Sequence, residues 1–200
     1  MSVHFVSDTH FGHANIIQYS SRPYRDVNHM NTSLVSNWNS VVQPTDDVYH
    51  LGDVCMGNLN ESVEWIWKLN GNIHLIRGNH DSKSVKNDRF VSRFEWIKDY
   101  HEMKIKHDGK EYKIILFHFP IASWHHAYRG AFHVHGHCHS TYKPGRPSTL
   151  DQGKILDVGV DCHNYTPVSL PQVIKIMERK IFKKVDDHEI RDTEGEKTYG

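Results

Sequence analysis

The stretch that decides the fold is residues 75–81, "LIRGNHD". A short apolar run, typical of a buried strand, ends there at an arginine and a glycine. Three side chains follow directly that can bind a metal, carry a proton or accept one. Asn, His and Asp in succession at the end of a strand form either a turn or a site, and the surrounding sequence decides between the two.

The composition indicates one globular domain. The chain has 200 residues, with 38% hydrophobic and 11% aromatic side chains, enough for a core of its own. Lys and Arg number 24, and Asp and Glu also number 24, so the net charge is zero and non-specific binding to duplex nucleic acid is not favoured. We expect a single domain over residues 1–192 and a flexible tail over residues 193–200.

The cysteines and the N-terminus bear on the cellular compartment. Cys55, Cys138 and Cys162 are far apart and form no C-x-x-C pair, which favours a reduced protein without a disulfide framework. The N-terminus "MSVHFVSDTH" has no long apolar region, and no later stretch approaches membrane-spanning length. We therefore expect a cytoplasmic protein with no membrane partner, while the sequence leaves the oligomeric state open.

Apolar runs of strand type alternate with helical patterns in the first half of the chain, and strands predominate later. The spacing predicts strands at 3–6, 47–51, 73–76, 132–135 and 155–160, a hairpin with arms at 103–106 and 111–117, and helices over 31–42, over 61–69 and from Pro171. This order predicts an α/β sandwich with its helices outside. Ligand sites in open α/β sheets lie beyond the carboxyl ends of the strands.

Five strand ends carry the same chemistry in a chain with 18 histidines. They are Asp8-Thr9-His10, Gly52-Asp53, Gly78-Asn79-His80-Asp81, His118 and Gly136-His137-Cys138-His139. Residues i and i+2 of an extended segment point the same way, so each D-x-H or H-x-H pair can approach one centre. Mixed oxygen and nitrogen ligands suit Mn²⁺, Fe, Zn²⁺, Co²⁺ or Ni²⁺ better than Ca²⁺. They are too many for one tetrahedral zinc, and two ions roughly 3.5–4 Å apart would use them all.

These blocks, D-x-H, G-D, G-N-H-D, H and G-H-x-H in order, resemble the calcineurin-like metallophosphoesterase superfamily, in particular its small stand-alone prokaryotic members. The resemblance covers nearly the whole chain apart from the tail. It implies a four-layer α/β/β/α sandwich with a dinuclear metal centre, manganese foremost, at one sheet edge. It also implies a ligand set: Asp8, His10 and His139 for one ion, Asn79, His118 and His137 for the other, and Asp53 as the bridge.

The resemblance further implies phosphoester hydrolysis by attack of a hydroxide that bridges the two ions. His80, as imidazolium, would protonate the leaving alkoxide. Asp81 is expected to orient His80 or support the site, and Arg77 to contact the phosphate or point away from it. Met56 stands where the phosphoprotein-phosphatase branch carries a second acid, so another group must partner His80, and that substrate class is disfavoured.

Several functions stay open within this frame. We favour a phosphodiesterase acting on a nucleotide-like or other small substrate, with a phosphomonoesterase as the alternative. A non-catalytic metal-bound nucleotide sensor or scaffold is the alternative of another class, and a nuclease acting on a nucleic acid polymer is disfavoured. Candidate substrate contacts are His13, Tyr24, Arg25, Trp124 and His125.

Some polar residues near these motifs favour a structural role. Core packing explains Trp124 as well as stacking on a nucleobase does, and we expect His133 and His135 to pack within their strand. Cys138 lies between two expected ligands and should point the opposite way. Asp161 is expected to form part of a closing turn.

Overall fold

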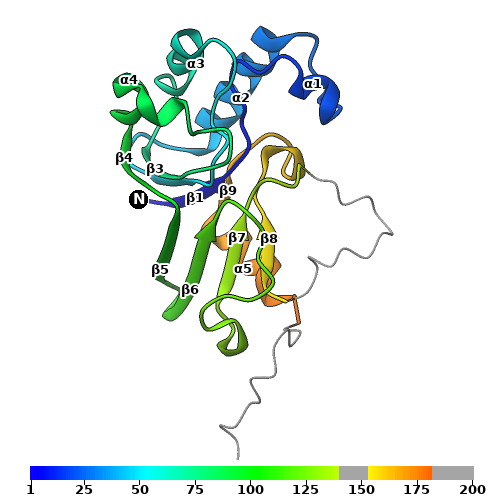
Figure 1. Cartoon of the computed structure of the whole chain (residues 1–200). Helices are drawn as coiled ribbons and strands as arrows, with labels where there is room; N and C mark the ends of the chain where they lie inside the picture. The colour runs from blue at the N-terminus through cyan, green and yellow to red at the C-terminus, as the bar shows by residue number, and fades with distance from the viewer. Residues whose placement is uncertain (140–152, 182–200) are drawn as a thin grey trace, which may run out of the picture.

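The computed structural model describes residues 1–139 and 153–181. The strands form two mixed sheets with the orders β4-β3-β2-β1-β9 and β5-β6-β7-β8 (Figure 1). The first sheet contains β1 (Val3–Val6), β2 (Asp47–His50), β3 (Asn72–Ile76), β4 (Phe94–Lys98) and β9 (Val168–Ser169). The second contains β5 (Tyr100–His107), β6 (Lys110–Phe117), β7 (Phe132–His135) and β8 (Ile155–Asp157). The predicted tail, residues 193–200, lies outside the described residues.

Helices cover one face of the first sheet (Figure 1). They are α1 (Ile16–Tyr19), α2 (Val27–Val41), α3 (Leu59–Ile66), the 3₁₀ turn η1 (Ser84–Lys86) and α4 (Asp88–Val91). Leu34 and Trp38 of α2 share a buried cluster with Val48 of the sheet, because one apolar stripe of the helix faces the strands. Helix α2 begins four residues before its predicted start, since the Asp26 side chain accepts a hydrogen bond from the His29 N–H and caps it.

The other face of the first sheet packs on the second sheet. Phe5 of β1 shares a buried cluster with Leu116 of β6 and Val134 of β7, and Val173 of α5 (Leu170–Glu178) joins the same cluster. These contacts confirm the predicted α/β sandwich. The outer face of the second sheet is covered, among the described residues, by the segment around Trp124 and the turn η2 (Ala127–Arg129), so the four-layer arrangement stays a prediction.

The strand directions bring distant loops to one edge. Strands β1, β2 and β3 pair in parallel, as do β6, β7 and β8, so within each sheet their carboxyl ends lie together. A bridge between Ser7 and Gly159 joins the two sheets at these ends, with the Ser7 N–H donating to the Val158 carbonyl at 3.0 Å. The predicted polar blocks therefore converge on one junction between the sheets.

Two strands were absent from the sequence prediction. Strand β4 reads "FEWIK" and lies at the edge of the first sheet, and β9 contains two residues, too few for a period to show. Within residues 1–139 and 153–181, every helix is too short or too polar to cross a lipid bilayer.

Candidate metal centre

Two groups of His and Asp side chains lie at the junction of the sheets. One contains Asp8, His10 and His139, and the other contains Asp53, His118 and His137. Within each group the possible ligand atoms all lie within 4.8 Å of one another. The structure thus brings together six of the seven predicted ligands in these two groups, and the seventh, Asn79, contacts the second group.

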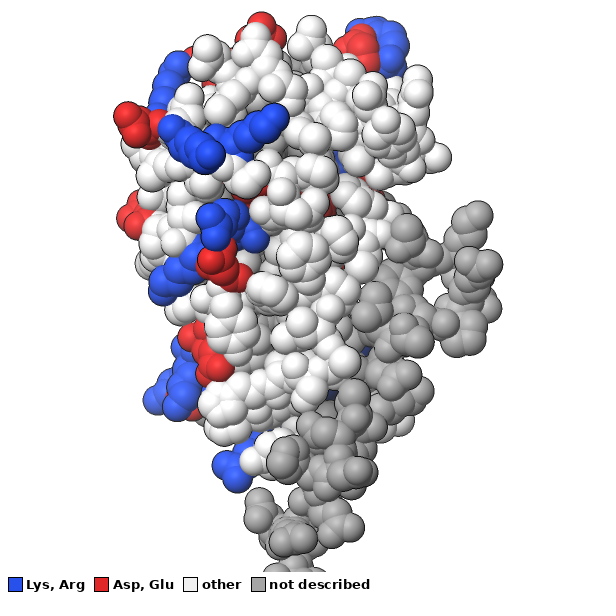
Figure 2. Space-filling model, in the orientation of Figure 1, with Lys and Arg blue, Asp and Glu red and all other residues white. Residues whose placement is uncertain are grey.

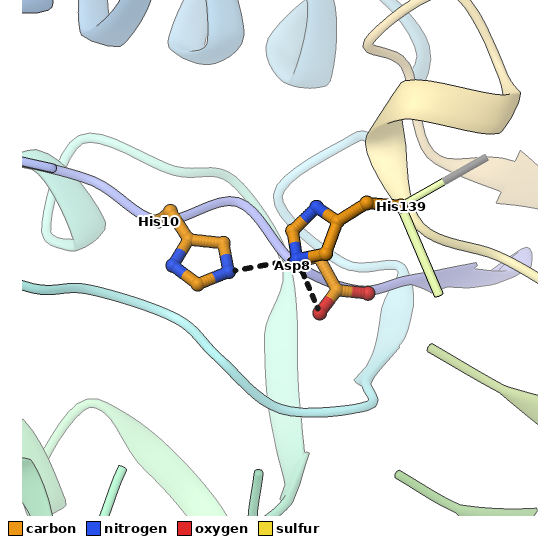
Figure 3. A group of neighbouring side chains, drawn as sticks. All are labelled: Asp8, His10 and His139. Atoms are coloured by element: carbon orange, nitrogen blue, oxygen red, sulfur yellow. Dashed lines mark hydrogen bonds and ion pairs between the residues drawn. The ribbon is translucent and has the colours of Figure 1, made fainter. Parts of the chain in front are cut away.

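We call Asp8, His10 and His139 the buried group (Figure 3). Asp8 and His10 are 0% and 2% exposed. The Nε2 atoms of His10 and His139 are 3.3 Å apart, and His139 Nε2 lies 3.7 Å from Asp8 Oδ1. Burial raises the pKa of Asp8 well above its usual value and lowers the pKa of His10 well below its own. Such a group has a strong need for a compensating cation.

A buried ion pair between Arg22 and Asp161 contacts this group through His139 and Asp8. Arg22 donates from Nε and Nη2 to the two carboxylate oxygens of Asp161, each at 2.8 Å, and from Nη2 to the Asp8 carbonyl at 2.7 Å. Asp161, in the turn η3 (Val160–Cys162), accepts a 2.8 Å hydrogen bond from His139 Nδ1. Burial works against the charge of His139, but this bond and the nearby carboxylates raise its pKa overall. Because a carboxylate only accepts, Nδ1 carries a proton, and Nε2 is the ring atom that faces His10 and Asp8 and is available to a cation.

We call Asp53, Asn79, His118 and His137 the open group, because Asn79 and His137 are exposed. Asn79 Oδ1 lies 2.9 Å from His118 Nε2 and 3.1 Å from His137 Nδ1. His118 is 0% exposed, and its Nδ1 donates to the Leu51 carbonyl at 2.6 Å. With Nδ1 donating, Nε2 is the ring atom that faces the Asn79 oxygen.

Asp53 lies between the two groups. Its Oδ2 is 3.7 Å from His10 Nε2 and 3.6 Å from His118 Nε2, while its Oδ1 accepts a hydrogen bond from the His80 N–H. Asp8 Oδ1 is buried and has no hydrogen-bond partner among the described residues. Ring nitrogens and carboxylate oxygens thus face one another, and one carboxylate oxygen is buried and unsatisfied. A divalent cation placed among such donors satisfies them. The residues present therefore fit divalent metal ions.

The backbone is bent sharply to aim these ligands. Five of them have a left-handed φ, between 46° and 72°: Asp8, His10, Asp53, His137 and His139. At Gly78 a Cβ atom would collide with the backbone and carboxylate of Asp53, so only glycine allows the two loops to approach this closely.

His80 and Asp81 have separate roles in the structure. The His80 side chain is 41% exposed, and its Nε2 lies 3.9 Å from Asp53 Oδ2. Asp81 is fully buried and accepts three hydrogen bonds from the backbone N–H groups of Asp53, Val54 and Gly78. Asp81 thus holds the Asp53 loop, and of the two alternatives for Asp81 these contacts favour support of the site.

Two predicted residues near His80 lie in different surroundings. The ring of His13 is 5.4 Å from that of His10, centroid to centroid, so His13 adjoins the buried group. Arg77 forms a two-pronged ion pair with Asp99, at 2.7 and 2.8 Å, on the exposed surface. Of the two alternatives for Arg77, the structure favours the one in which the side chain points away from the expected phosphate position.

The other candidate substrate contacts have partners of their own. Tyr24 packs its ring on Tyr165 at 5.1 Å, and Arg25 pairs with Asp26 at the start of α2. Trp124 is 8% exposed and donates to the Ala131 carbonyl, as the core-packing alternative expects. His125 lies 2.9 Å from Glu102 on the second sheet. Their part in substrate binding stays a prediction.

Sequence reasoning missed Arg22 and the role of Asp161. The two residues are 139 positions apart, and Arg22 lies in a loop with no periodic pattern. The signal that the sequence did contain was local: in "VGVD", as in "HLGD", a glycine and then an acid follow shortly after a strand, here β8, which pairs in parallel with β7.

Comparison with known proteins finds an archaeal relative that matches nearly the whole chain. Over 188 residues the chain is 36% identical to the uncharacterized protein MJ1445 of Methanocaldococcus jannaschii, an alignment that covers 92% of this chain and 97% of that protein. The chain belongs to the family of that archaeal protein. No protein-family model matches the sequence.

Solved structures share the fold. The protein of unknown function AQ665 from Aquifex aeolicus is 26% identical, with a TM-score of 0.66 and coverage of 88% of this chain and 98% of that one. A novel archaeal phosphodiesterase is 19% identical with a TM-score of 0.42, covering 80% and 82% of the two chains, a likeness too distant to carry an argument. The α/β fold is therefore shown by AQ665, and the activity has to be argued from the site.

Proposed function

We propose that the chain is a metal-dependent phosphoesterase of the metallophosphoesterase type, built as the predicted four-layer sandwich and acting on a small phosphodiester. The observation that carries the proposal is the position of Asp53, whose Oδ2 lies between His10 of the buried group and His118 of the open group. Two divalent ions, manganese foremost, would be held by these two groups. When bound, they supply an activated water and neutralise charge on the phosphoryl oxygens.

His80 is the candidate general acid. Its exposed imidazole stands beside Asp53 and lines a cavity of about 390 Å³. In the proposed reaction a water molecule adds to phosphorus, the ester P–O bond breaks, and the leaving oxygen takes the proton of His80. A general acid of this kind accelerates hydrolysis by about 10²–10⁴-fold.

The cavity beside His80 supports a substrate with a second ester substituent. Asn79, Met56 and Lys83 also line it, and the Lys83 ammonium forms no ion pair with any described residue. Met56 and Leu59 give the cavity an apolar wall with the Lys83 ammonium beside it, which suits a small organic group that carries a polar or anionic end, as a nucleotide does. Met56, at the place of an absent acid, contributes to this wall.

The surface offers little support for a nucleic acid polymer as substrate. On the described residues of the face in Figure 2, Lys and Arg lie next to Asp and Glu, mostly along one side, and form no continuous basic area. Binding to a polyanion depends on clustered Lys and Arg, so we propose a small-molecule substrate.

The test is hydrolysis by the purified full chain after metal removal and reconstitution with Mn²⁺. We expect turnover of bis-nitrophenyl phosphate above that of mono-nitrophenyl phosphate, and its loss in Asp53→Asn. His80→Ala should lose about 10²–10⁴-fold on an alkyl phosphodiester and much less on the nitrophenyl ester, whose leaving group needs little protonation. The matched control is His107→Ala, at the far end of β5. Turnover that survives chelation, or a parental rate in Asp53→Asn, would refute the proposal; preference for the monoester would favour the phosphomonoesterase.

A further inference from the structure

A third group of possible ligands lies at the same edge but belongs to neither half of the candidate centre. It consists of His135 at the end of β7, Asp157 at the end of β8, and Cys138, and their ligand atoms all lie within 4.8 Å of one another. Cys138 lies between His137 and His139 in the chain, but its thiol groups with His135 and Asp157 and with neither set of the candidate centre. The sequence patterns gave none of the three a role in binding.

Asp157 has a buried carboxylate oxygen that lacks a hydrogen-bond donor among the described residues. The residue is 7% exposed, and its Oδ1 accepts a 2.7 Å hydrogen bond from the Gly159 N–H. Its Oδ2 is buried and has no hydrogen-bond partner within residues 1–139 and 153–181. A buried carboxylate oxygen without a partner destabilises the fold unless a cation or a proton satisfies it. The carboxylate of Asp8 is close by, because a Cβ atom on Gly159 would lie 2.9 Å from Asp157 Oδ1 and 3.1 Å from Asp8 Oδ2.

His135 is prepared to donate a lone pair. It is 1% exposed, and its Nδ1 lies 2.8 Å from the Gly136 carbonyl oxygen. A carbonyl only accepts, so Nδ1 carries the proton and the neutral ring leaves Nε2 as the free ligand atom. Metal-binding histidines in proteins are oriented by this kind of hydrogen bond on the opposite ring nitrogen.

We propose that His135, Cys138 and Asp157 bind a further divalent cation of the zinc class. One imidazole nitrogen, one thiolate and one carboxylate make a mixed donor set that suits Zn²⁺, with water completing a tetrahedron. The thiol releases its proton when the cation binds. Because Cys138 lies between His137 and His139, this ion fixes the segment that carries two ligands of the candidate centre, and its role is structural. The proposal does not depend on the phosphoesterase activity.

The first test uses the full chain loaded with Co²⁺ after metal removal. A thiolate ligand gives a near-ultraviolet sulfur-to-cobalt charge-transfer band. We expect this band in the parent protein, its loss in Cys138→Ser, and its retention in Cys55→Ser, whose thiol is buried near Ser84. Absence of the band from the parent overturns the proposal without recourse to any variant.

Cys162 supplies a sharper control, because its side chain also reaches the Asp157 carboxyl. Retention of the band in Cys162→Ser supports Cys138 as the ligand. Loss of the band in Cys162→Ser, with retention in Cys138→Ser, overturns the proposed ligand set.

Zinc stoichiometry gives a second measurement. We expect Cys138→Ser and Asp157→Asn each to bind one Zn²⁺ per chain fewer than the parent by elemental analysis, with folding checked by circular dichroism. Asp53→Asn removes a ligand of the candidate centre but none of this group, so the cobalt band should persist there. A parental zinc content in both Cys138→Ser and Asp157→Asn contradicts the proposal. Because the band and the phosphoesterase rate are measured separately, failure of one does not imply failure of the other.

Discussion

The buried group and the open group use the same kinds of side chain but are held in different ways. His139 of the buried group rests on Asp161, which is paired with Arg22, and both support residues are almost fully buried. His118 of the open group is held by the neutral Leu51 carbonyl, and its neighbours Asn79 and His137 are exposed. We infer that the buried group binds its ion tightly, while the open group exchanges its ion and meets the substrate.

Among the predictions, removal of Arg22 should cause the largest loss of unfolding free energy, because Arg22 supports the buried group. Arg22→Met leaves Asp161 buried without its cationic partner and leaves the Asp8 and Thr9 carbonyls without a donor. Breaking a buried ion pair in this way costs about 3–5 kcal/mol. Urea unfolding of the metal-free protein measures the loss of unfolding free energy. A loss below about 1 kcal/mol would mean that the pair does not hold the buried group in place.

Asp161→Asn should weaken metal binding at the buried group as well as break the ion pair with Arg22. The amide keeps the shape but loses the charge that orients His139, and loss of such a supporting carboxylate lowers metal affinity by about 10–100-fold. Competition with a chelator should show one weakened site and one unchanged site. Equal weakening of both sites would remove the distinction between the two groups.

His133, a buried histidine outside both groups, provides a reference for the effect of burial on the pKa of an imidazole in this fold. Burial lowers the pKa of His133 to about 4, and its neighbours include the Ile115 and Phe119 carbonyls, Trp124 and His135. Between this value and the unfolded pKa of about 6.5, the unfolded chain binds a proton that the folded chain excludes, so stability falls as pH falls through this window.

The test compares His133→Gln with the parent by urea unfolding at pH 7.5 and pH 5. The contribution of His133 to the loss of stability between these pH values is about 2 kcal/mol, from the two pKa values. The variant, which does not titrate, should lose that much less than the parent. An identical pH dependence in both proteins would show that His133 does not exclude a proton on folding.

Arg77→Ala should have the smallest effect. The ion pair with Asp99 is exposed, its side chains being 42% and 64% accessible, and such pairs contribute about 0.2–1 kcal/mol. Unfolding free energy and Mn²⁺-dependent rate can be measured on the same preparation. A tenfold or larger loss of rate with stability intact would support the alternative in which Arg77 contacts the phosphate.

The sequence predicted those parts of the fold and the site that local patterns encode. Each expected ligand block follows an apolar run, and parallel pairing of β1 with β2 and of β6 with β7 brings the ends of such runs together. The early start of α2 was not predicted because it depends on a cap at Asp26.

The support of the site could not be predicted because it arises only from tertiary contact. Arg22 meets Asp161 across 139 positions, and Asp81 reaches back 27 and 28 positions to the N–H groups of Val54 and Asp53. Asp157 falls inside the strand predicted over 155–160, and its unsatisfied oxygen becomes visible only when the surrounding segments are placed around it. Ligand types follow from sequence, whereas the groups that aim them follow from packing.

The left-handed backbone at Asp8, His10, Asp53, His137 and His139 has a consequence for engineering. Each such residue carries roughly 1–2 kcal/mol of conformational cost that glycine would relieve and asparagine would reduce. A selection for heat resistance alone would therefore enrich glycine or asparagine at these five positions and yield sturdier but inert variants. Thermostabilised forms of this protein should instead be sought in libraries that keep those codons fixed.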